Sequence, residues 1–355
     1  MMLDEDLSKR INSLRFLLIV FVVFIHNNVS FMNFADGAET YEIPVYVEKI
    51  RYAISELIAR VAVPLFFLIS GLLLYAKETS FITVLKKKSR TILAPYLIWN
   101  VLSLVFFFVA QKIPFAKPYF ANPQNLVRNF SIIDFIDVFV GKFRRAPPYP
   151  LVYQFWFLRD LFILDLLFLP IKALIDKAPA ATLTLFCILW LIDANIYIVN
   201  PAALLFFSLG CYIVKFNVSY KHIDAIRSRD AIMMYAVAII VSLFFAEDIP
   251  IMSAINIVVG IVFFIKMSRC FVVNRRLYQR LLWLKQYAFF VYAIHEPLLT
   301  IMKKLSVRII PMRGGWILLQ YFGVAALGIL IFLNAGILVR KITPRLYALL
   351  TGGRL

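Results

Sequence analysis

Long apolar runs, separated by short polar and basic segments, dominate the hydrophobicity pattern of this chain. A helix needs roughly 20 apolar residues to cross a hydrocarbon core of about 30 Å, and about ten of the runs come close to that length. The pattern therefore predicts an all-α polytopic membrane protein, built as a bundle of about ten transmembrane helices. The predicted spans are residues 14–32, 54–76, 90–110, 151–171, 179–195, 200–215, 230–246, 249–266, 286–303 and 316–339.

The basic residues predict an orientation for this bundle. Segments on the same side as the N-terminus hold most of the Lys and Arg residues between the runs. Cytoplasmic loops carry such an excess, so both termini are expected in the cytoplasm and the chain in the cell inner (cytoplasmic) membrane. The longest outer loop, residues 111–150, is rich in proline and aromatic residues and is long enough for a lid or an acceptor platform.

No internal repeat, low-complexity tract or appended soluble domain is evident in the sequence. Residues 1–355 are therefore expected to form a single integral membrane domain that contains the whole activity.

Composition supports the membrane class and narrows the partners. Hydrophobic residues make up 62% of the 355 positions, charged residues 16%, and the mean hydropathy is +0.84, which disfavours a soluble globular protein. The formal net charge of +18 lies in short loops, so the expected anionic partners are membrane lipids or a phosphate-bearing ligand and no nucleic acid.

The cysteines and the glycines disfavour further structural and functional classes. The three cysteines are isolated, so neither a disulfide framework nor a metal is expected. The sequence also lacks a glycine-rich phosphate loop, which makes an ATP-driven pump a poor interpretation.

Polar side chains inside apolar runs are informative because each costs free energy unless it is paired or faces a cavity. The first run carries Arg15 near its start and His26 eleven residues later. At about 1.5 Å per residue this separation is about 16 Å, which places His26 near or just beyond mid-membrane. Taken alone, His26 is equally well explained as a hydrogen-bonded structural histidine or as a catalytic base.

Four further stretches carry a family resemblance: FFLISG at 66–71, KKKSRTILAPY at 86–96, FWFLRDL at 155–161 and YAFFVYAIHEP at 287–297. Together with the Arg-x10-His of the first run, they resemble the membrane acyltransferase 3 family from Arg15 to about Val339. The resemblance implies a bundle of about ten helices. It also implies transfer of an acyl group, usually acetyl from acetyl-CoA, to a hydroxyl of a glycan or lipid-linked sugar.

The resemblance assigns residues one at a time. Arg15 and His26 match the family's first-helix pair, FFLISG matches its Phe-Phe-x-x-Ser-Gly element, and Tyr292 with His295 match its Tyr-x-x-His element. Lys87 and Arg90 stand where members often carry Arg-x-x-Arg, so bidentate arginine recognition is absent at the first of these positions.

The chemistry of each residue suggests a role, beside which a structural one stays open. Arg15, Lys87 and Arg90 are expected to bind the donor's phosphates, although the lysines also fit the positive-inside rule. A neutral His26 would accept the acceptor's hydroxyl proton. Ser70 would orient the acceptor or the thioester carbonyl, whereas Gly71 beside it equally suits a close helix contact.

The remaining candidates surround this centre. His295 is expected to support catalysis. A carboxylate could hold its imidazole in one tautomer, but the neighbouring Glu296 need not do so, because adjacent residues on a helix point in different directions. Asn27 would orient His26 or the acceptor, and Tyr292 is placed with it among the substrate-binding residues. Trp156 would stack on a sugar or the adenine, or anchor the helix at the interface.

Two further hypotheses concern polar residues away from this centre. Arg159 and Asp160, with Asp165 further along, are expected to neutralise each other or Arg60, most simply as a structural ion pair. His222 is expected to be solvated.

Two other functions remain open from the sequence. A secondary transporter or flippase of a glycan or a small anion would also bury charges, although no repeat symmetry favours it. A catalytically silent partner of export machinery would be expected to lack the histidine pair. The acceptor, the acylated position, acetyl versus succinyl or a longer donor, and the oligomeric state are left open; direct transfer is favoured over an acyl-enzyme.

Overall fold

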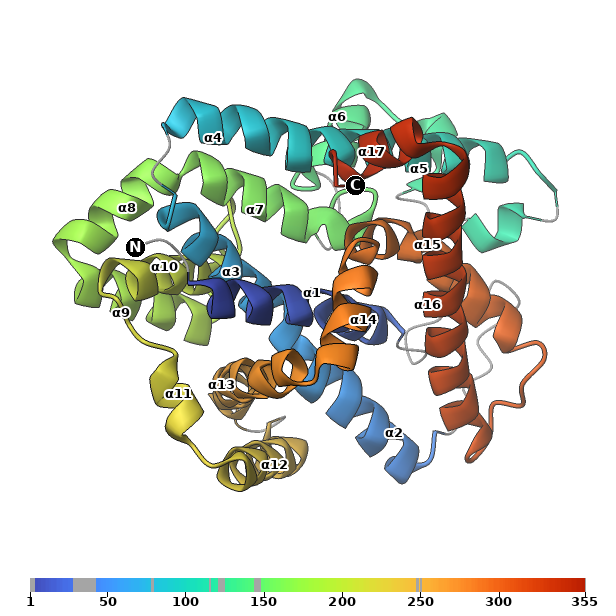
Figure 1. Cartoon of the computed structure of the whole chain (residues 1–355). Helices are drawn as coiled ribbons and strands as arrows, with labels where there is room; N and C mark the ends of the chain where they lie inside the picture. Colours follow the sequence, from blue (N-terminus) through green and yellow to red (C-terminus); the bar gives the residue numbers. More distant parts are fainter. Residues whose placement is uncertain are drawn as a thin grey trace. The chain divides into compact units, whose positions relative to one another are not determined.

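The computed structural model describes residues 4–27, 43–77, 80–114, 116–120, 125–143, 148–246, 249 and 251–354, and all regular secondary structure in these ranges is helical (Figure 1). The end of the first predicted span, at residues 28–32, lies outside the described residues, as do residues 33–42 after it and, in the loop 111–150, residues 115, 121–124 and 144–147. The α-helices are α1 Glu5–His26, α2 Val45–Tyr52, α3 Ala62–Tyr75, α4 Phe81–Lys88, α5 Ala94–Ala110, α6 Ile132–Val140, α7 Trp156–Leu166, α8 Phe168–Lys177, α9 Pro179–Leu191, α10 Pro201–Lys215, α11 Lys221–Ala225, α12 Ser228–Phe245, α13 Ile251–Val273, α14 Arg275–Lys285, α15 Ala288–Ser306, α16 Trp316–Ile342 and α17 Pro344–Thr351.

The chain divides into two compact units, each assembled from three separate stretches of sequence. Unit 1 contains Met1–His26, Glu48–Leu85 and Ile163–Phe289, and unit 2 contains Asn27–Val47, Lys86–Phe162 and Phe290–Leu355. The expectation of a single functional domain stays a prediction.

The helices confirm a helical membrane protein. Among the described residues, five helical stretches are long and apolar enough to cross a membrane. The predicted runs at 179–195 and 200–215 form the shorter apolar helices α9 and α10, and the run at 151–171 is divided between α7 and α8. The count of about ten spans and the cytoplasmic termini therefore stay predictions. The five stretches are Val45–Tyr75, Phe81–Ala110, Ser228–Phe245, Ile251–Val273 and Trp316–Ile342.

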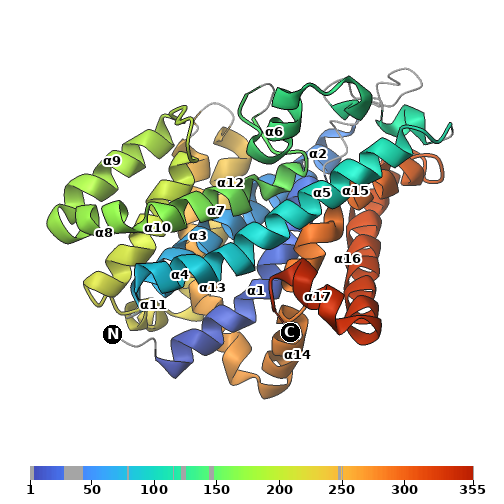
Figure 2. The same cartoon turned by 90° about the horizontal axis from the view of Figure 1, so that it is seen from above.

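Unit 1 is centred on the contact between α3 and α10, which lie side by side in both views (Figures 1 and 2). A Cβ atom on Gly71 would collide with the main-chain carbonyl of Phe207, and one on Gly210 with that of Leu68. Two glycines thus allow the two backbones to touch, as small residues do in membrane helix pairs. The sequence hypothesis of a close helix contact at Gly71 is confirmed.

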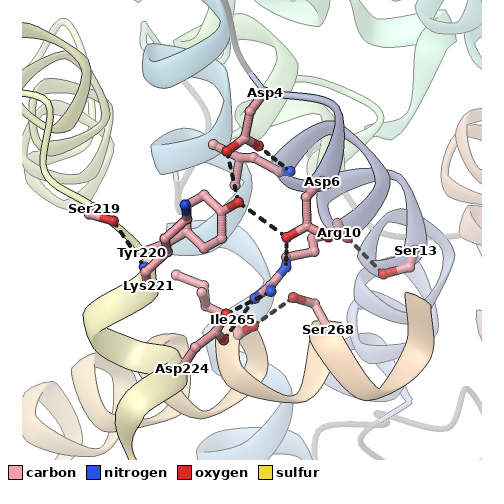
Figure 3. Close-up of polar contacts among 11 residues, drawn as sticks. Asp4, Asp6, Arg10, Ser13, Ser219, Tyr220, Lys221, Asp224, Ile265 and Ser268 are labelled. Carbon is pink, nitrogen blue, oxygen red and sulfur yellow. Dashed lines mark hydrogen bonds and ion pairs between the residues drawn. The ribbon is translucent and has the colours of Figure 1, made fainter. Parts of the chain in front are cut away.

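A charged cluster ties the start of α1 to α11 and α13 within unit 1 (Figure 3). The buried guanidinium of Arg10 donates two hydrogen bonds to Asp224, at 2.9 and 2.7 Å, and one to Asp6 at 2.7 Å. It also lies 4.8 Å from the centre of the Tyr220 ring. Lys266 of α13 donates to the carbonyl of Asp224 at 2.7 Å, so Asp224 links α11 both to Arg10 of α1 and to α13.

Unit 2 is held at one end by the C-terminal helix α17, which packs against α5 (Figure 2). The indole of Trp99 donates to the carbonyl of Leu350 at 2.9 Å. Gly352 follows α17 with a φ of 67°, which favours glycine, and a side chain there would strike the backbone of Thr91.

The described part of the loop 111–150 is ordered by side chains that bind its backbone. Ser131 and Asp134 form a capping box at the start of α6. The carboxylate of Asp137 accepts from the main-chain N–H groups of Lys142 and Phe143 at 2.7 and 2.9 Å. Local hydrogen bonds thus shape this part of the loop, and its role as a lid or an acceptor platform stays a prediction.

Candidate active site

The first-helix pair lies on α1 in unit 1. Arg15 is one residue past the buried Leu14, and His26 is the last residue of the helix, half-buried. The eleven residues between them correspond to about 16 Å along the helix axis. The end of α1 is fixed by Ser55, whose hydroxyl donates to the carbonyl of Phe24 at 2.7 Å.

Arg15 lies beside a second cation. Its Nε is buried and has no hydrogen-bond partner in the described part of the chain. Lys285, at the end of α14, donates to Asn12 at 3.3 Å, one turn before Arg15. Burial, and then the positive charge of Arg15, lower the pKa of Lys285. Because no described carboxylate pairs with either cation, the pair has the charge of an anion-binding site.

Ser70 belongs to α3 in unit 1, where its hydroxyl is engaged locally. It donates to the carbonyl of Phe66, one turn earlier, at 2.8 Å. Such a bond to the preceding turn is common for serine in helices, and it leaves the oxygen lone pairs to accept from a ligand.

The basic cluster before the third predicted span lies in unit 2 at the junction of α4 and α5. Lys87 is an exposed residue of α4, and Arg90 is an exposed residue of the π-helical segment Ser89–Leu93 that joins α4 to α5. π-Helical turns often occur at functional positions. Both cations are accessible, as donor binding would require.

The Tyr-x-x-His element forms one connected group in unit 2. His295 is fully buried on α15, and its Nδ1 lies 2.6 Å from the carbonyl oxygen of Tyr292. A carbonyl only accepts, so Nδ1 carries the hydrogen, and in a neutral imidazole Nε2 then holds the lone pair. The geometry therefore fixes one tautomer of His295.

Tyr292 is held by its own contacts. Its hydroxyl donates to the carbonyl of Gln154 at 2.8 Å. Its ring stacks on Phe155, with ring centres 5.6 Å apart and planes 23° apart, and meets Phe157 edge-on at 6.1 Å. The FWFLRDL stretch and the Tyr-x-x-His element are thus packed together.

Glu296, the residue after His295, binds Tyr153. It interrupts α15, with φ −111° and ψ 138°, just before Pro297, since the residue before a proline avoids helical angles. Its carboxylate accepts from the hydroxyl of Tyr153 at 3.0 Å, and its carbonyl from the Gln154 amide at 3.5 Å. Nothing in the sequence pattern pairs Tyr153 with Glu296, because the two are far apart along the chain.

Asn27 and Trp156 also belong to unit 2. The Asn27 amide is fully buried and donates to the carbonyl of Tyr321 at 2.5 Å, while its Oδ1 has no partner among the described residues. Trp156 is the half-buried first residue of α7. Asn27 therefore presents an open acceptor, which suits a hydroxyl donor.

The structure groups some of the predicted residues and leaves others separate. Tyr292 and His295 contact each other, whereas Arg15, His26 and Ser70 belong to unit 1 and Lys87, Arg90, Asn27 and Trp156 to unit 2. The sequence analysis did not identify Lys285 as a candidate site residue. Its position at the edge of the ninth predicted span was the available signal.

Other sequence hypotheses have plain outcomes. Arg159 and Asp160 form a buried ion pair at 3.0 Å, which confirms that hypothesis. His222 is exposed on α11, as predicted. In the part of the chain that the structure describes, no group of three His, Cys, Asp or Glu residues is arranged to hold a metal ion.

Comparisons with known proteins cover nearly the whole chain. Residues 8–339 match the family model described as an acyltransferase domain. The succinoglycan biosynthesis protein ExoH of Rhizobium meliloti (strain 1021) is 26% identical over 367 residues, covering 99% of this chain and 94% of that relative. No solved structure matches.

Proposed function

Because this chain belongs to the acyltransferase family and is a membrane acyltransferase, we propose that it moves an acetyl group from cytoplasmic acetyl-CoA to a hydroxyl of a cell-surface or lipid-linked glycan. The ExoH relative is named for the biosynthesis of a glycan, succinoglycan, which supports a glycan acceptor. In this proposal the enzyme lies in the inner membrane with about ten spans and both termini in the cytoplasm.

The observation that carries the proposal is the arrangement of charge along α1. Arg15 lies beside the second cation Lys285, and no described carboxylate pairs with either of them. Arg15 is about 16 Å along the helix axis from His26. Acetyl-CoA has the matching layout, with phosphates at one end, an extended pantetheine arm, and the thioester at the other end. Lys87 and Arg90 would complete phosphate binding.

The reaction follows from this placement. The acceptor hydroxyl oxygen attacks the thioester carbonyl while its proton passes to the neutral imidazole of His26. The C–S bond then breaks, and the CoA thiolate leaves and takes up a proton, so the products are the ester and CoA. No acyl-enzyme is needed.

The other candidates would bind and support the reacting groups. His295, in its fixed tautomer, would support the transition state, and Ser70 would accept a hydrogen bond from the ligand. Asn27, Trp156 and Tyr292 would orient the sugar.

The test is a transfer assay on purified protein with radiolabelled acetyl-CoA and glycan acceptors from the producing cell. His26→Ala should lower the transfer rate by roughly 10²- to 10⁴-fold, the usual cost of a lost general base, while the binding of acetyl-CoA is retained. His222→Ala, the same change at an exposed histidine, is the matched control. Near wild-type transfer by His26→Ala with a lowered melting temperature would instead identify a packing histidine.

A further inference from the structure

A cavity of about 490 Å³ lies in unit 2, where α5 ends and α15 passes. Its volume is within the roughly 300–1,000 Å³ typical of small-molecule sites. Phe106 and Val109 of α5 line it, together with Ile113 just beyond that helix. Leu305 contributes from α15, and Arg308 from the turn after it. The walls are almost wholly apolar, and none of the residues proposed for acyl transfer lines the cavity.

The side chain of Gln111 fixes one wall of the cavity by hydrogen bonds to the backbone of the residues that follow α5. The Gln111 amide donates to the carbonyls of Phe120 and Asn125 at 3.3 and 2.7 Å, and its oxygen accepts from the N–H of Val127 at 3.1 Å. These bonds hold Phe120 edge-on against Phe106, with ring centres 5.4 Å apart. The chain therefore folds back after α5, and Phe120 adds a wall to those formed by α5 and α15.

The charge around the cavity has one sign. Arg308 is the single charged side chain among the described residues that line it, and its side chain is exposed. The exposed Lys112 and Lys117 lie in the segment after α5, next in sequence to the lining residues Ile113 and Ala116. A hydrocarbon chain suits the aromatic walls, and a phosphate suits the guanidinium. A small soluble anion would not contact the apolar walls, and a phosphate at the head of the chain complements the positive charge at the cavity.

We propose that this cavity binds the hydrocarbon chain of a phosphate-headed lipid, with the phosphate on Arg308, and that this lipid is the anchor of the acceptor glycan. The assignment of this lipid as the glycan's anchor rests on the proposed function. Ile301 and Leu305 belong to α15, the helix that also carries the Tyr-x-x-His element, so the cavity and that element share one part of unit 2.

The first test is photolabelling with a dodecyl phosphate that carries a diazirine at the end of its chain. The protein is held in nanodiscs of phosphatidylcholine, and labelled peptides are identified by mass spectrometry. Label is expected on the peptides that contain Val109 and Leu305. Val109→Trp fills the cavity and should lower labelling at least about tenfold, equivalent to about 1.4 kcal/mol.

Matched variants keep this test falsifiable. Val105→Trp adds the same ring to an equally exposed valine on α5 that does not line the cavity, and it should label like the wild type. Arg308→Gln should also lower labelling about tenfold, unlike Arg313→Gln, a nearby exposed arginine. Equal labelling in both members of either pair overturns the proposal. Elution on size exclusion checks that every variant is folded.

Competition separates the two possible sources of lipid phosphate. Unlabelled dodecyl phosphate should displace the probe, and the same excess of phosphatidylglycerol should not. If phosphatidylglycerol competes equally, the cavity is a general phospholipid site and the anchor assignment is wrong. Failure of wild-type acetyl transfer would count against the proposed function alone, because photolabelling does not depend on turnover.

Discussion

Arg15 is a residue whose position costs the apo protein stability. Its partly desolvated guanidinium faces Lys285 rather than a carboxylate, and a desolvated cation is unfavourable unless it is paired. An anionic ligand would supply the missing partner. Binding and stability should therefore respond to Arg15 in opposite directions.

Arg15→Gln tests this opposition. We expect the affinity for acetyl-CoA to fall about 10- to 100-fold, the worth of a charge-assisted hydrogen bond, while the melting temperature without ligand stays level or rises. Calorimetry with CoA and a thermal melt measure the two effects. Arg280→Gln, on the exposed side of α14, should change neither; a fall in melting temperature with unchanged affinity would show Arg15 to be structural.

At this scale the sequence identified residue types better than partners. The pattern singled out His295, yet the carbonyl that fixes its tautomer belongs to Tyr292 and is visible only in three dimensions. Ser70 was predicted to orient a ligand, which stays a prediction, and the sequence did not reveal that its hydroxyl donates to the carbonyl of Phe66. Hydrogen-bond partners depend on rotamers and on distant backbone, neither of which an apolar pattern encodes.

At the scale of elements, the contact of α3 with α10 sets the spacing of unit 1. Its closeness depends on the missing Cβ atoms of Gly71 and Gly210. An added methyl group must push the backbones apart, and overpacking of this kind costs typically 1–3 kcal/mol.

Gly71→Ala should accordingly lower the melting temperature of the protein. Gly323→Ala, in α16, is the matched control, because a Cβ there meets nothing within 4 Å. Alanine is favoured over glycine inside a helix by about 0.5–1 kcal/mol, so this control should hold or raise the melting temperature. Equal effects of the two substitutions would remove the special status of the α3–α10 contact.

The boundaries of elements show where apolar patterns stop being informative. The first run was predicted from residue 14, but α1 begins at Glu5 because Asp4 accepts from the N–H of Leu7 at 2.7 Å and acidic residues fill the first turn. The run at 151–171 is interrupted between α7 and α8, and both sides of the break are apolar. Hydrophobicity predicted the class of fold, and local capping decided the lengths.

At the scale of the molecule, 38 lysine and arginine residues outnumber 20 aspartate and glutamate residues, and Asp224 is a carboxylate that binds one of these cations. Hydrogen bonds from Arg10, opposed by burial, hold the pKa of Asp224 below its ordinary value. A depressed pKa contributes stability that is complete above the unfolded value, near 4, and is lost as the pH falls through the native value.

The Arg10–Asp224 contact should therefore give unit 1 an acid-sensitive part of its stability. Asp224→Asn should lower the melting temperature at pH 7, and its difference from the wild type should shrink as the pH falls below about 4. Thermal melts between pH 7 and pH 3 measure this change. Asp230→Asn, an exposed carboxylate near Asp224 in sequence, should follow the wild type at every pH; a constant gap for Asp224→Asn would refute the linkage.

The interleaving of the two units along the chain has a consequence for biogenesis. α1 is translated before the other described helices, yet its neighbours in unit 1 include α13 and α14, which follow it by more than 200 residues. Arg10 likewise has no Asp224 to bind until α11 has been made. Unit 1 can therefore close only after α14 has been translated, and until then α1 is without these neighbours.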